Sequence, residues 1–250
     1  MTLQSIRRRL ASWFAPAAEA GLDRDALAAL YLKGDGIEVG ALHNPLPLPK
    51  QARVRYVDRM SVADLRRQYP ELETTPLVEP DIVDDGEKLT RFADASLDFV
   101  IANHFLEHCE DPIATLKSFG RVLKPGGILY LAVPDKRYTW DVDRPTTTIE
   151  HLVADHEQGP AVSRSEHFRE FAGAMHKLAG VPMYEKTLHL LTDPAHLERV
   201  NYSIHFHVWN HSEFLALMVA MLQRYAIPLE IELALALTRV GETVTILRKR

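Results

Sequence analysis

Apolar and polar residues follow two alternating patterns from about residue 36 to residue 134. Short apolar runs of strand length are separated by stretches in which apolar residues recur at helical spacing. The run ILYLAVP (128–134) is almost unbroken, which is typical of a strand buried on both faces of a parallel sheet. The alternation therefore predicts an α/β fold with a doubly wound sheet. The predicted strands are residues 36–40, 52–60, 80–86, 96–104 and 128–134.

Capping residues mark the starts of the predicted helices. Asp111 followed by Pro112 is a typical start, since aspartate accepts from free backbone amides and proline tolerates the first helical position. The predicted helices are 24–33 after Asp23 and ended by Gly34, 62–69 after Ser61 with Asp64, and 112–123.

The alternation lapses between about residues 135 and 200, where only helices over 147–157 and 165–180 are indicated. The tail is regular again. It predicts a strand over 202–209, a helix over 212–225 and an antiparallel pair, 229–237 and 242–250, joined around Gly241. We interpret the chain as one domain made of N-terminal helices (1–35), a core (36–134), an inserted cap (135–200) and C-terminal strands with a helix (201–250).

The first twenty residues resemble a secretory signal peptide superficially, with a basic patch, a short apolar stretch and a small-residue end. Pro16 breaks the apolar part, and apolar residues recur there at helical spacing. An amphipathic helix with Arg7, Arg8 and Arg9 on its wet side is the better interpretation. The sequence has no run that approaches the ~20 apolar residues of a membrane span.

Composition narrows the classes of function. The chain has 46% hydrophobic and 25% charged residues and a net charge of −5, so nothing favours binding to nucleic acid. Cys109 is the only cysteine, which excludes an intrachain disulfide and suits a reducing, cytoplasmic location. The sequence gives no indication of oligomeric state.

Polar residues and glycines follow the predicted strands at the edge where open α/β sheets bind ligands. Glu38 and Gly40 end the first strand, and Asp58 ends the second, twenty residues after Glu38. An acidic residue at this place commonly accepts the two hydroxyls of a ribose. Asp85 and Gly86 follow the third strand and suit an adenine edge. The loop NHFLEH (103–108) follows the fourth strand.

In these segments the chain resembles class I S-adenosylmethionine-dependent methyltransferases, especially the group called type 11. The resemblance covers residues 36–134 and rests on GIEVGAL, YVDRM, DDGEKL, SLDFVIANHFLEHCEDP and RVLKPGGILYLAVPD. It implies a seven-stranded, mostly parallel sheet (Rossmann-like) with an antiparallel last strand, and S-adenosyl-L-methionine as cofactor. The chain also resembles bacterial methyltransferases of surface-polysaccharide clusters.

The resemblance implies a set of cofactor contacts. Glu38, Gly40 and Ala41 would lie against the methionine part, and Asp58, Arg59 and Met60 would hold the ribose. Asp85 and Gly86 would hold the adenine, and Asn103 and His104 would face the sulfonium. The first loop has one glycine where the family has two or three, which leaves the place of the cofactor's carboxylate open. It also argues against a nicotinamide cofactor, whose pyrophosphate needs a glycine-lined helix start.

The loop 103–108 contains H-x-x-E-H, the pattern of an inverted zinc-protease motif. That motif requires one helix, whereas this segment leaves a buried strand and soon enters another helix. Relatives with E-x-x-E-H here bind a divalent ion, and this chain has His104 in place of the first glutamate. We assign no metal ligand and expect Glu107 and His108 to brace the loop, while a site of His104, Glu107, His108 and a later histidine stays open.

Two further clusters are candidates for the substrate site. Alternation places His205 and His207 on one face with Trp209, either as a pocket wall or as a solvated face. Asp135 ends the fifth strand, and Arg137, Tyr138 and Arg144 follow it. These arginines could bind a carboxylate or phosphate, or form local ion pairs in a solvated loop.

Methyl transfer to a hydroxyl needs in-line alignment and removal of a proton. The candidate bases are His104, Asp135, His205 and His207, with imidazole preferred because its pKa lies near neutrality. The polar cap predicts O-methylation of a polar small molecule such as a sugar or glycan end. The alternatives are an N- or O-methyltransferase of natural-product biosynthesis, with or without a metal, and an inactive methyltransferase fold that serves as a partner subunit.

Overall fold

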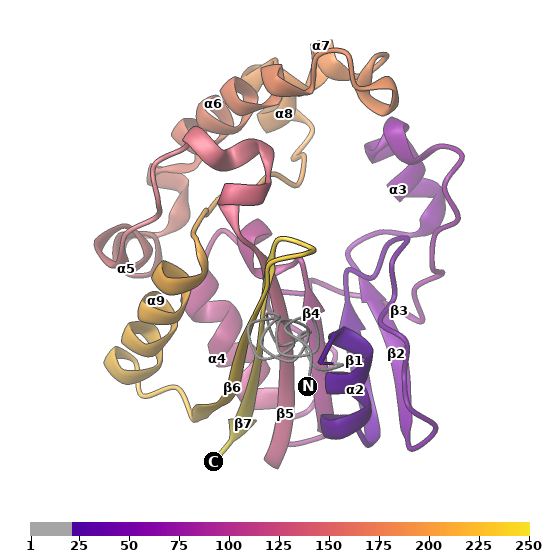
Figure 1. The fold of residues 1–250 in the computed structure, drawn as a ribbon, viewed down its shortest axis with the longest axis vertical. Helices are drawn as coiled ribbons and strands as arrows, with labels where there is room; N and C mark the ends of the chain where they lie inside the picture. The colour runs from indigo at the N-terminus through magenta and orange to yellow at the C-terminus, as the bar shows by residue number, and fades with distance from the viewer. Residues whose placement is uncertain (1–21) are drawn as a thin grey trace, which may run out of the picture.

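The computed structural model of the protein describes residues 22–250 and places a seven-stranded sheet at the centre (Figure 1). The strands are β1 (Gly34–Val39), β2 (Ala52–Asp58), β3 (Ile82–Val83), β4 (Leu97–Asn103), β5 (Leu123–Pro134), β6 (Leu229–Leu237) and β7 (Glu242–Lys249). Their order is β3-β2-β1-β4-β5-β7-β6. The first five pair in parallel, and β7 runs antiparallel to both β5 and β6. The predicted sheet with its antiparallel last strand is therefore confirmed.

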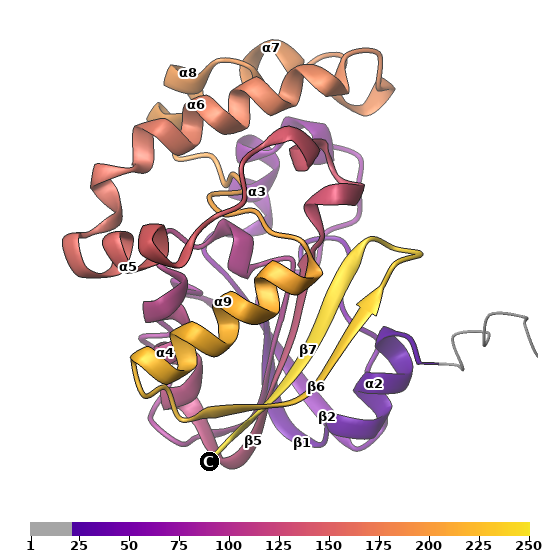
Figure 2. The same ribbon diagram turned by 60° about the vertical axis from the view of Figure 1, so that its left-hand side comes forward.

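Helices cover both faces of the sheet. The α-helices are α2 (Arg24–Tyr31), α3 (Val62–Gln68), α4 (Pro112–Val122), α5 (Ile149–Gln158), α6 (Arg164–Met175), α7 (Leu188–Leu191), α8 (Pro194–Arg199) and α9 (His211–Arg224). Figure 2 shows α4 and α9 on one face and α2 on the other. No helix among residues 22–250 is long and apolar enough to cross a membrane.

Alternation along the central strands supplies one apolar layer to each face. In β4, Val100 packs into the core under α4 and α9, whereas Phe99 and Ile101 pack into the core under α2. Phe99 also fills the space above Gly36, where an added Cβ would lie 2.3 Å from the Phe99 ring. Glycine is required there because β1 and β4 are adjacent and the ring has no other room.

The predicted caps form as expected. Asp111 accepts from the Ala114 amide at the start of α4, and Ser61 accepts from the Asp64 amide at the start of α3. Asp23 accepts from Ala26 at the start of α2, but the predicted end of that helix was wrong. The helix stops at Tyr31, and Gly34, with φ of +83°, begins β1.

The cap lies over the carboxyl ends of the strands and consists of α5 to α8 with short 3₁₀ turns (Figure 1). Its own apolar cluster joins α6 to Leu191, Leu197, Ile204 and Phe206. The strand predicted over 202–209 was wrong. This segment is extended but pairs with no strand, because its polar backbone groups bond to cap and loop residues such as Glu107 and Thr147.

The amphipathic helix predicted within the first twenty residues lies outside the described residues.

Candidate active site

A cavity of about 340 Å³ lies between the carboxyl edge of the sheet and the cap. Strand ends and loops form one wall, and α6, α7 and the extended segment (residues 202–209) form the other. Both the sheet and the cap are therefore needed to form the cavity. The sheet wall includes Val39, Gly40, Asp58, Arg59, Asp85, Gly86, His104 and Phe105. The cap wall includes Trp140, Phe171, Met175, Leu178, Tyr184, Leu191, Tyr202 and Phe206. The first wall is rich in carboxylates, and the second is largely apolar and aromatic.

Asp58 is the acidic residue on the sheet wall with free acceptor capacity. Its Oδ1 accepts from the Met60 amide at 3.3 Å, and no side-chain donor of residues 22–250 is bonded to this carboxylate. Burial raises the pKa of this carboxyl group, against the opposing effect of the backbone amides of Met60 and Arg59. A half-buried carboxylate with unused lone pairs suits a vicinal diol such as that of a ribose.

Two glycines give the sheet wall its shape. Gly40 has φ of +67°, a left-handed conformation that lets the chain turn away from β1 beside the cavity. At Gly86 an added Cβ would lie 2.4 Å from Val39 and 2.8 Å from the Phe105 ring. Asp85 beside it accepts from the Glu87 amide and pairs with Lys88. Of the predicted cofactor contacts, Gly40, Asp58, Arg59, Asp85, Gly86 and His104 line the cavity.

Four predicted cofactor contacts lie elsewhere: Glu38, Ala41, Met60 and Asn103 are not among the lining residues. Glu38 is 1% exposed, and both its carboxylate oxygens accept from the Leu46 amide, so this residue fixes the loop after β1. Burial raises the pKa of Glu38 to about 7. The amide of Asn103 is buried and has no hydrogen-bond partner within the described chain.

His104 is held between two carboxylates at the edge of the cavity. Its Nε2 lies 2.9 Å from Glu242 and its Nδ1 lies 3.6 Å from Glu107. Desolvation opposes the charged ring, but the hydrogen bonds to Glu107 and Glu242 prevail and raise the pKa of His104 to about 9. Glu242 also pairs with Arg24. At neutral pH His104 is therefore an imidazolium, which cannot act as a base.

His205 is the histidine of the cavity wall that a carboxylate orients. Its Nδ1 lies 2.6 Å from Asp141 Oδ2, and Asp141 also accepts from Arg144 at 2.8 Å. Burial opposes ionisation of Asp141, but the bond to His205 and the charges of His205 and Arg144 lower its pKa to about 2. Because an ionised carboxylate only accepts, Nδ1 of His205 donates, and Nε2 is the atom that can take a proton.

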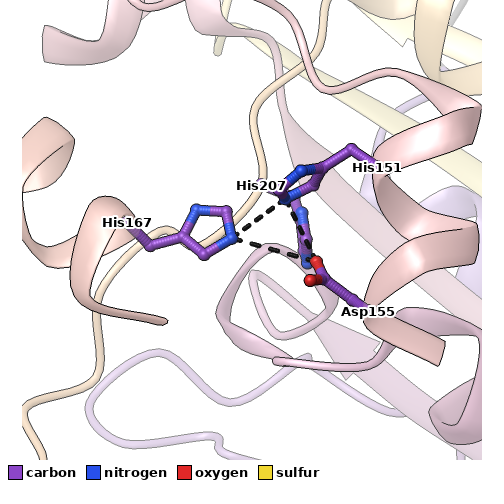
Figure 3. Close-up of side chains that lie close together, drawn as sticks. All are labelled: His151, Asp155, His167 and His207. Carbon is purple, nitrogen blue, oxygen red and sulfur yellow. Dashed lines mark hydrogen bonds and ion pairs between the residues drawn. The ribbon is translucent and has the colours of Figure 1, made fainter. Parts of the chain in front are cut away.

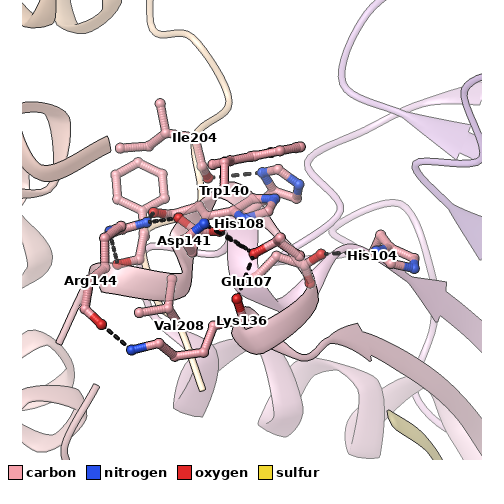
Figure 4. A network of polar contacts seen from close by, with 12 residues as sticks. His104, Glu107, His108, Lys136, Trp140, Asp141, Arg144, Ile204 and Val208 are labelled. Atoms are coloured by element: carbon pink, nitrogen blue, oxygen red, sulfur yellow. Dashed lines mark hydrogen bonds and ion pairs between the residues drawn. The ribbon is translucent and has the colours of Figure 1, made fainter. Parts of the chain in front are cut away.

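Aromatic rings pack around His205, and two of the residues that carry them, Trp140 and His108, are labelled in Figure 4. It stacks on Trp140 at 5.3 Å between ring centroids and meets His108 edge-on at 4.8 Å. Nδ1 of His108 donates to the Ile204 carbonyl at 2.8 Å, and burial lowers the pKa of His108 to about 4, so that ring is neutral. The Glu107 carbonyl accepts from the Phe206 amide. These bonds join the loop after β4 to the extended segment.

Glu107, His108 and His205 also bring three metal-binding atoms within 4.8 Å of one another. His104 is not part of this group, although its Nδ1 lies 3.6 Å from Glu107; its Nε2 bonds to Glu242. The group differs from the set named from sequence in that it lacks His104, and His205 is the later histidine of that set.

The other predicted site residues do not line the cavity. Asp135 is buried, accepts from the His211 amide at 3.2 Å and pairs with Arg137 at 2.6 Å. Burial opposes ionisation of Asp135, but these bonds lower its pKa. Tyr138 is exposed. These contacts end the fifth strand and begin α9, so they organise the connection rather than the cavity.

Arg144, His207 and Trp209 are buried because they make structural contacts. The Arg144 guanidinium binds Asp141, Glu170 and the His205 carbonyl, which leaves it no access to a ligand. Trp209 is 1% exposed and packs on Phe214 in the core. His207 lies in a separate cluster with residues of α5 and α6. The side chains of residues 202–209 do not follow the strict alternation expected of a strand, because this segment is not part of a sheet.

Several lining residues were missed from the sequence, among them Glu71, Trp140 and Tyr202, and so was Asp141, which lies behind His205. Glu71 accepts from the Tyr202 hydroxyl at 2.5 Å, and its other oxygen has no hydrogen-bond partner among residues 22–250. The only local signal was the sequence WDVDR, in which an acidic residue three positions before Arg144 suggests an ion pair. Contacts between α3, the cap and the extended segment bring the rest together.

Comparison with known proteins identifies the domain that carries the sheet wall. Residues 36–131 match the family model described as a methyltransferase domain. That segment carries β1 to β5 and the sheet wall of the cavity up to Phe105. No curated protein matches the sequence.

Solved structures with a similar fold include a Rhodobacter sphaeroides protein assigned provisionally to the Zn-dependent alcohol dehydrogenases. It has a TM-score of 0.56 and 17% identity over 92% of this chain and 90% of that chain. A SAM-dependent methyltransferase from Methanosarcina mazei has a TM-score of 0.46 and 21% identity, over 91% and 98% of the two chains. A SAM-dependent methyltransferase from Aquifex aeolicus has a TM-score of 0.47 and 11% identity over 97% of this chain and 98% of that chain. At these identities a likeness shows the fold alone.

The matched domain, the order of the sheet and the cavity at its carboxyl edge lead to one assignment. The chain is an S-adenosylmethionine-dependent methyltransferase with S-adenosylmethionine as methyl donor. The expected enzyme class and cofactor are confirmed.

Proposed function

We propose that this methyltransferase methylates a hydroxyl group of a small polyhydroxylated molecule, such as a sugar or the end of a glycan. The observation that carries the proposal is the pair formed by His205 of the cavity wall and Asp141 behind it, because an imidazole whose Nδ1 is held by a carboxylate keeps Nε2 for taking a proton from a hydroxyl. S-adenosylmethionine supplies the electrophilic methyl group when bound.

In the proposed arrangement Asp58 binds the ribose hydroxyls, and Asp85 with Gly86 borders the adenine. Nε2 of His205 accepts the proton of the acceptor hydroxyl as that oxygen forms its bond to the methyl carbon. Asp141 holds the ring in the required tautomer and stabilises the imidazolium that results. The apolar cap wall excludes water from the reacting groups. His104 is already charged and takes no part in proton transfer.

The cap wall supports the expected sugar acceptor for a different reason than the one that the sequence suggested. The arginines that suggested a polar site, Arg137 and Arg144, point away from the cavity, and aromatic residues take their place. A sugar ring fits this wall because its apolar face can stack on Trp140 or Tyr202. Its hydroxyls can donate to Glu71, which has an unpartnered oxygen, or bond to Ser203.

A metal-assisted O-methyltransferase is the second candidate, favoured by the close approach of Glu107, His108 and His205. A divalent ion there would lower the pKa of a bound hydroxyl in place of a general base. A flat phenolic natural product with one hydroxyl would also pack on the aromatic wall, but with that hydroxyl at His205 it would have none left for Glu71.

Two experiments test the proposal in sequence. Calorimetry with S-adenosylmethionine establishes binding: no binding would favour an inactive fold that serves a partner, and equal binding by Asp58→Ala would contradict the role of Asp58 at the ribose. Transfer of labelled methyl groups is then measured with nucleotide sugars, oligosaccharides and phenols. Transfer to sugars that Asp141→Asn reduces, and that a chelator leaves unchanged, supports the proposal. Transfer to phenols alone would refute the acceptor class, and loss of transfer with a chelator would favour the metal-assisted route.

A further inference from the structure

A second cluster of ligating side chains lies outside the cavity, between the cap and the extended segment. It consists of His151 and Asp155 of α5, His167 of α6 and His207 (Figure 3). His151 and Asp155 are four residues apart and therefore share one face of α5. Figure 3 shows all four side chains converging on one point. None of them lines the methyl-transfer cavity.

The ligating atoms of these four residues lie close enough together to surround one metal ion. Nε2 of His151 lies 3.0 Å from Nε2 of His167 and 3.1 Å from Oδ2 of Asp155. Nε2 of His167 lies 3.9 Å from the same oxygen, and the atoms offered by all four residues lie within 4.8 Å of one another. Two ligands held at ~2.05 Å by one tetrahedral zinc ion are about 3.3 Å apart. The cluster therefore needs only small shifts to enclose an ion.

Burial and hydrogen bonding also point to a ligand. Asp155 is 2% exposed, His167 7% and His207 0%. Neither ring nitrogen of His207 has a hydrogen-bond partner within residues 22–250, although its ring faces the other three groups. A buried polar group without a partner is costly, and phenylalanine would fill the same space without that cost.

We propose that His151, Asp155, His167 and His207 bind a zinc ion that fixes the cap to the extended segment. Three imidazoles and one carboxylate form a donor set that suits zinc. The set supplies four ligands, which leaves no open position and makes the site structural rather than catalytic. Ser163 donates to the other oxygen of Asp155 and so orients this ligand. The site stands independently of the proposed acceptor and of the reaction in the cavity.

The ion would join α5, α6 and the extended segment, which come from three separate parts of the chain. His207 is two residues from His205, so the position of the proposed base depends on the same segment. Phe206 between them lines the cavity. A zinc ion would thus hold one wall of the active site in place without contacting the substrate.

The test begins with the metal content of the wild-type full-length chain, purified without chelator and analysed by mass spectrometry of the elements. We expect about one equivalent of zinc per chain from this cluster. Removal with a chelator is expected to lower the melting temperature by roughly 10 °C, and zinc alone should restore it. Cobalt in place of zinc should give the visible absorption of a tetrahedral site.

Variants assign the metal to this cluster. Asp155→Asn and His167→Gln should each lose one equivalent of zinc relative to wild type, whereas the exposed control His189→Gln should retain it. Glu107→Gln, in the other ligating group, should retain the zinc of the cap cluster. Loss of zinc with Glu107→Gln but not with His167→Gln would overturn the proposal.

A wild-type chain that is metal-free and takes up no added zinc would also overturn it, whatever the variants do. His207→Phe separates packing from ligation. If the ring only fills space, the variant should be as stable as wild type with zinc added. The proposal requires it to be less stable and to bind zinc at least tenfold more weakly.

Discussion

The two carboxylates beside His104 make the stability of the protein depend on pH in a specific window. The ring lies between Glu107 and Glu242, which raise its pKa from 6.5 to about 9. A histidine whose pKa is raised by folding stabilises the folded state fully below its unfolded pKa, and this contribution is lost as the pH rises through the folded pKa. The stabilisation by His104 should therefore be present at about pH 6 and absent above about pH 9.

The magnitude follows from the shift and the exposure of the ring. At ~1.4 kcal/mol per tenfold change in proton affinity, the shift corresponds to roughly 3 kcal/mol. The His104 side chain is 42% exposed, so screening by solvent reduces the expected contribution to about 1 kcal/mol. His104→Gln keeps a polar side chain of similar reach but cannot carry the charge.

The assay is urea unfolding of wild type and His104→Gln at several pH values from about 6 to 9.5. We expect the variant to be less stable by about 1 kcal/mol at the acidic end, and the two curves to converge at the alkaline end. The exposed control His189→Gln should follow wild type throughout. Curves of wild type and His104→Gln that stay parallel would refute the charged state of the ring, and with it the exclusion of His104 as a base.

Three further predictions concern the cofactor, the base and the core. Asp58→Asn should weaken binding of S-adenosylmethionine by about 10- to 100-fold, because hydrogen bonds to a charged group are worth ~1.5–3 kcal/mol; calorimetry that finds equal affinity would contradict this. Asp141→Asn should lower the rate of methyl transfer by about 10²- to 10⁴-fold while leaving cofactor affinity unchanged, since it removes the carboxylate that orients His205. Gly36→Ala should destabilise the protein by ~1–3 kcal/mol, because its Cβ would lie 2.3 Å from the Phe99 ring; Phe99→Leu in the same chain should recover part of this loss in urea unfolding.

Local signals were sufficient for most of the core. The apolar run of β5, the Asp111–Pro112 start of α4 and the turn at Gly241 each depend on neighbours in sequence, and each forms as expected. The wall of the cavity that follows the strand ends was predictable for the same reason, since the carboxyl ends of parallel strands meet at one edge. Asp58 and Asp85 line the cavity because β2 and β3 end there.

The cap could not be predicted in this way. His205 and His207 are two residues apart and were expected on one wall, yet one lines the cavity and the other lies in a closed cluster with α5 and α6. Their segment is extended without a partner strand, so its side chains follow the helices that pack on it and not the alternation of a sheet. Arg144 was expected to bind substrate, but its guanidinium forms ion pairs with Asp141 and Glu170.

By itself, the sequence determined the sheet, because its strands follow from periodicity, and it indicated the class of reaction through short segments that resemble a known family. Only the tertiary structure decided which histidine is charged, which faces the cavity and which meets other ligands. Those properties depend on residues up to 138 positions apart, such as Glu242 beside His104, whose proximity no local pattern encodes. The groups beside an imidazole set its charge and its role, and the tertiary structure determines which groups those are.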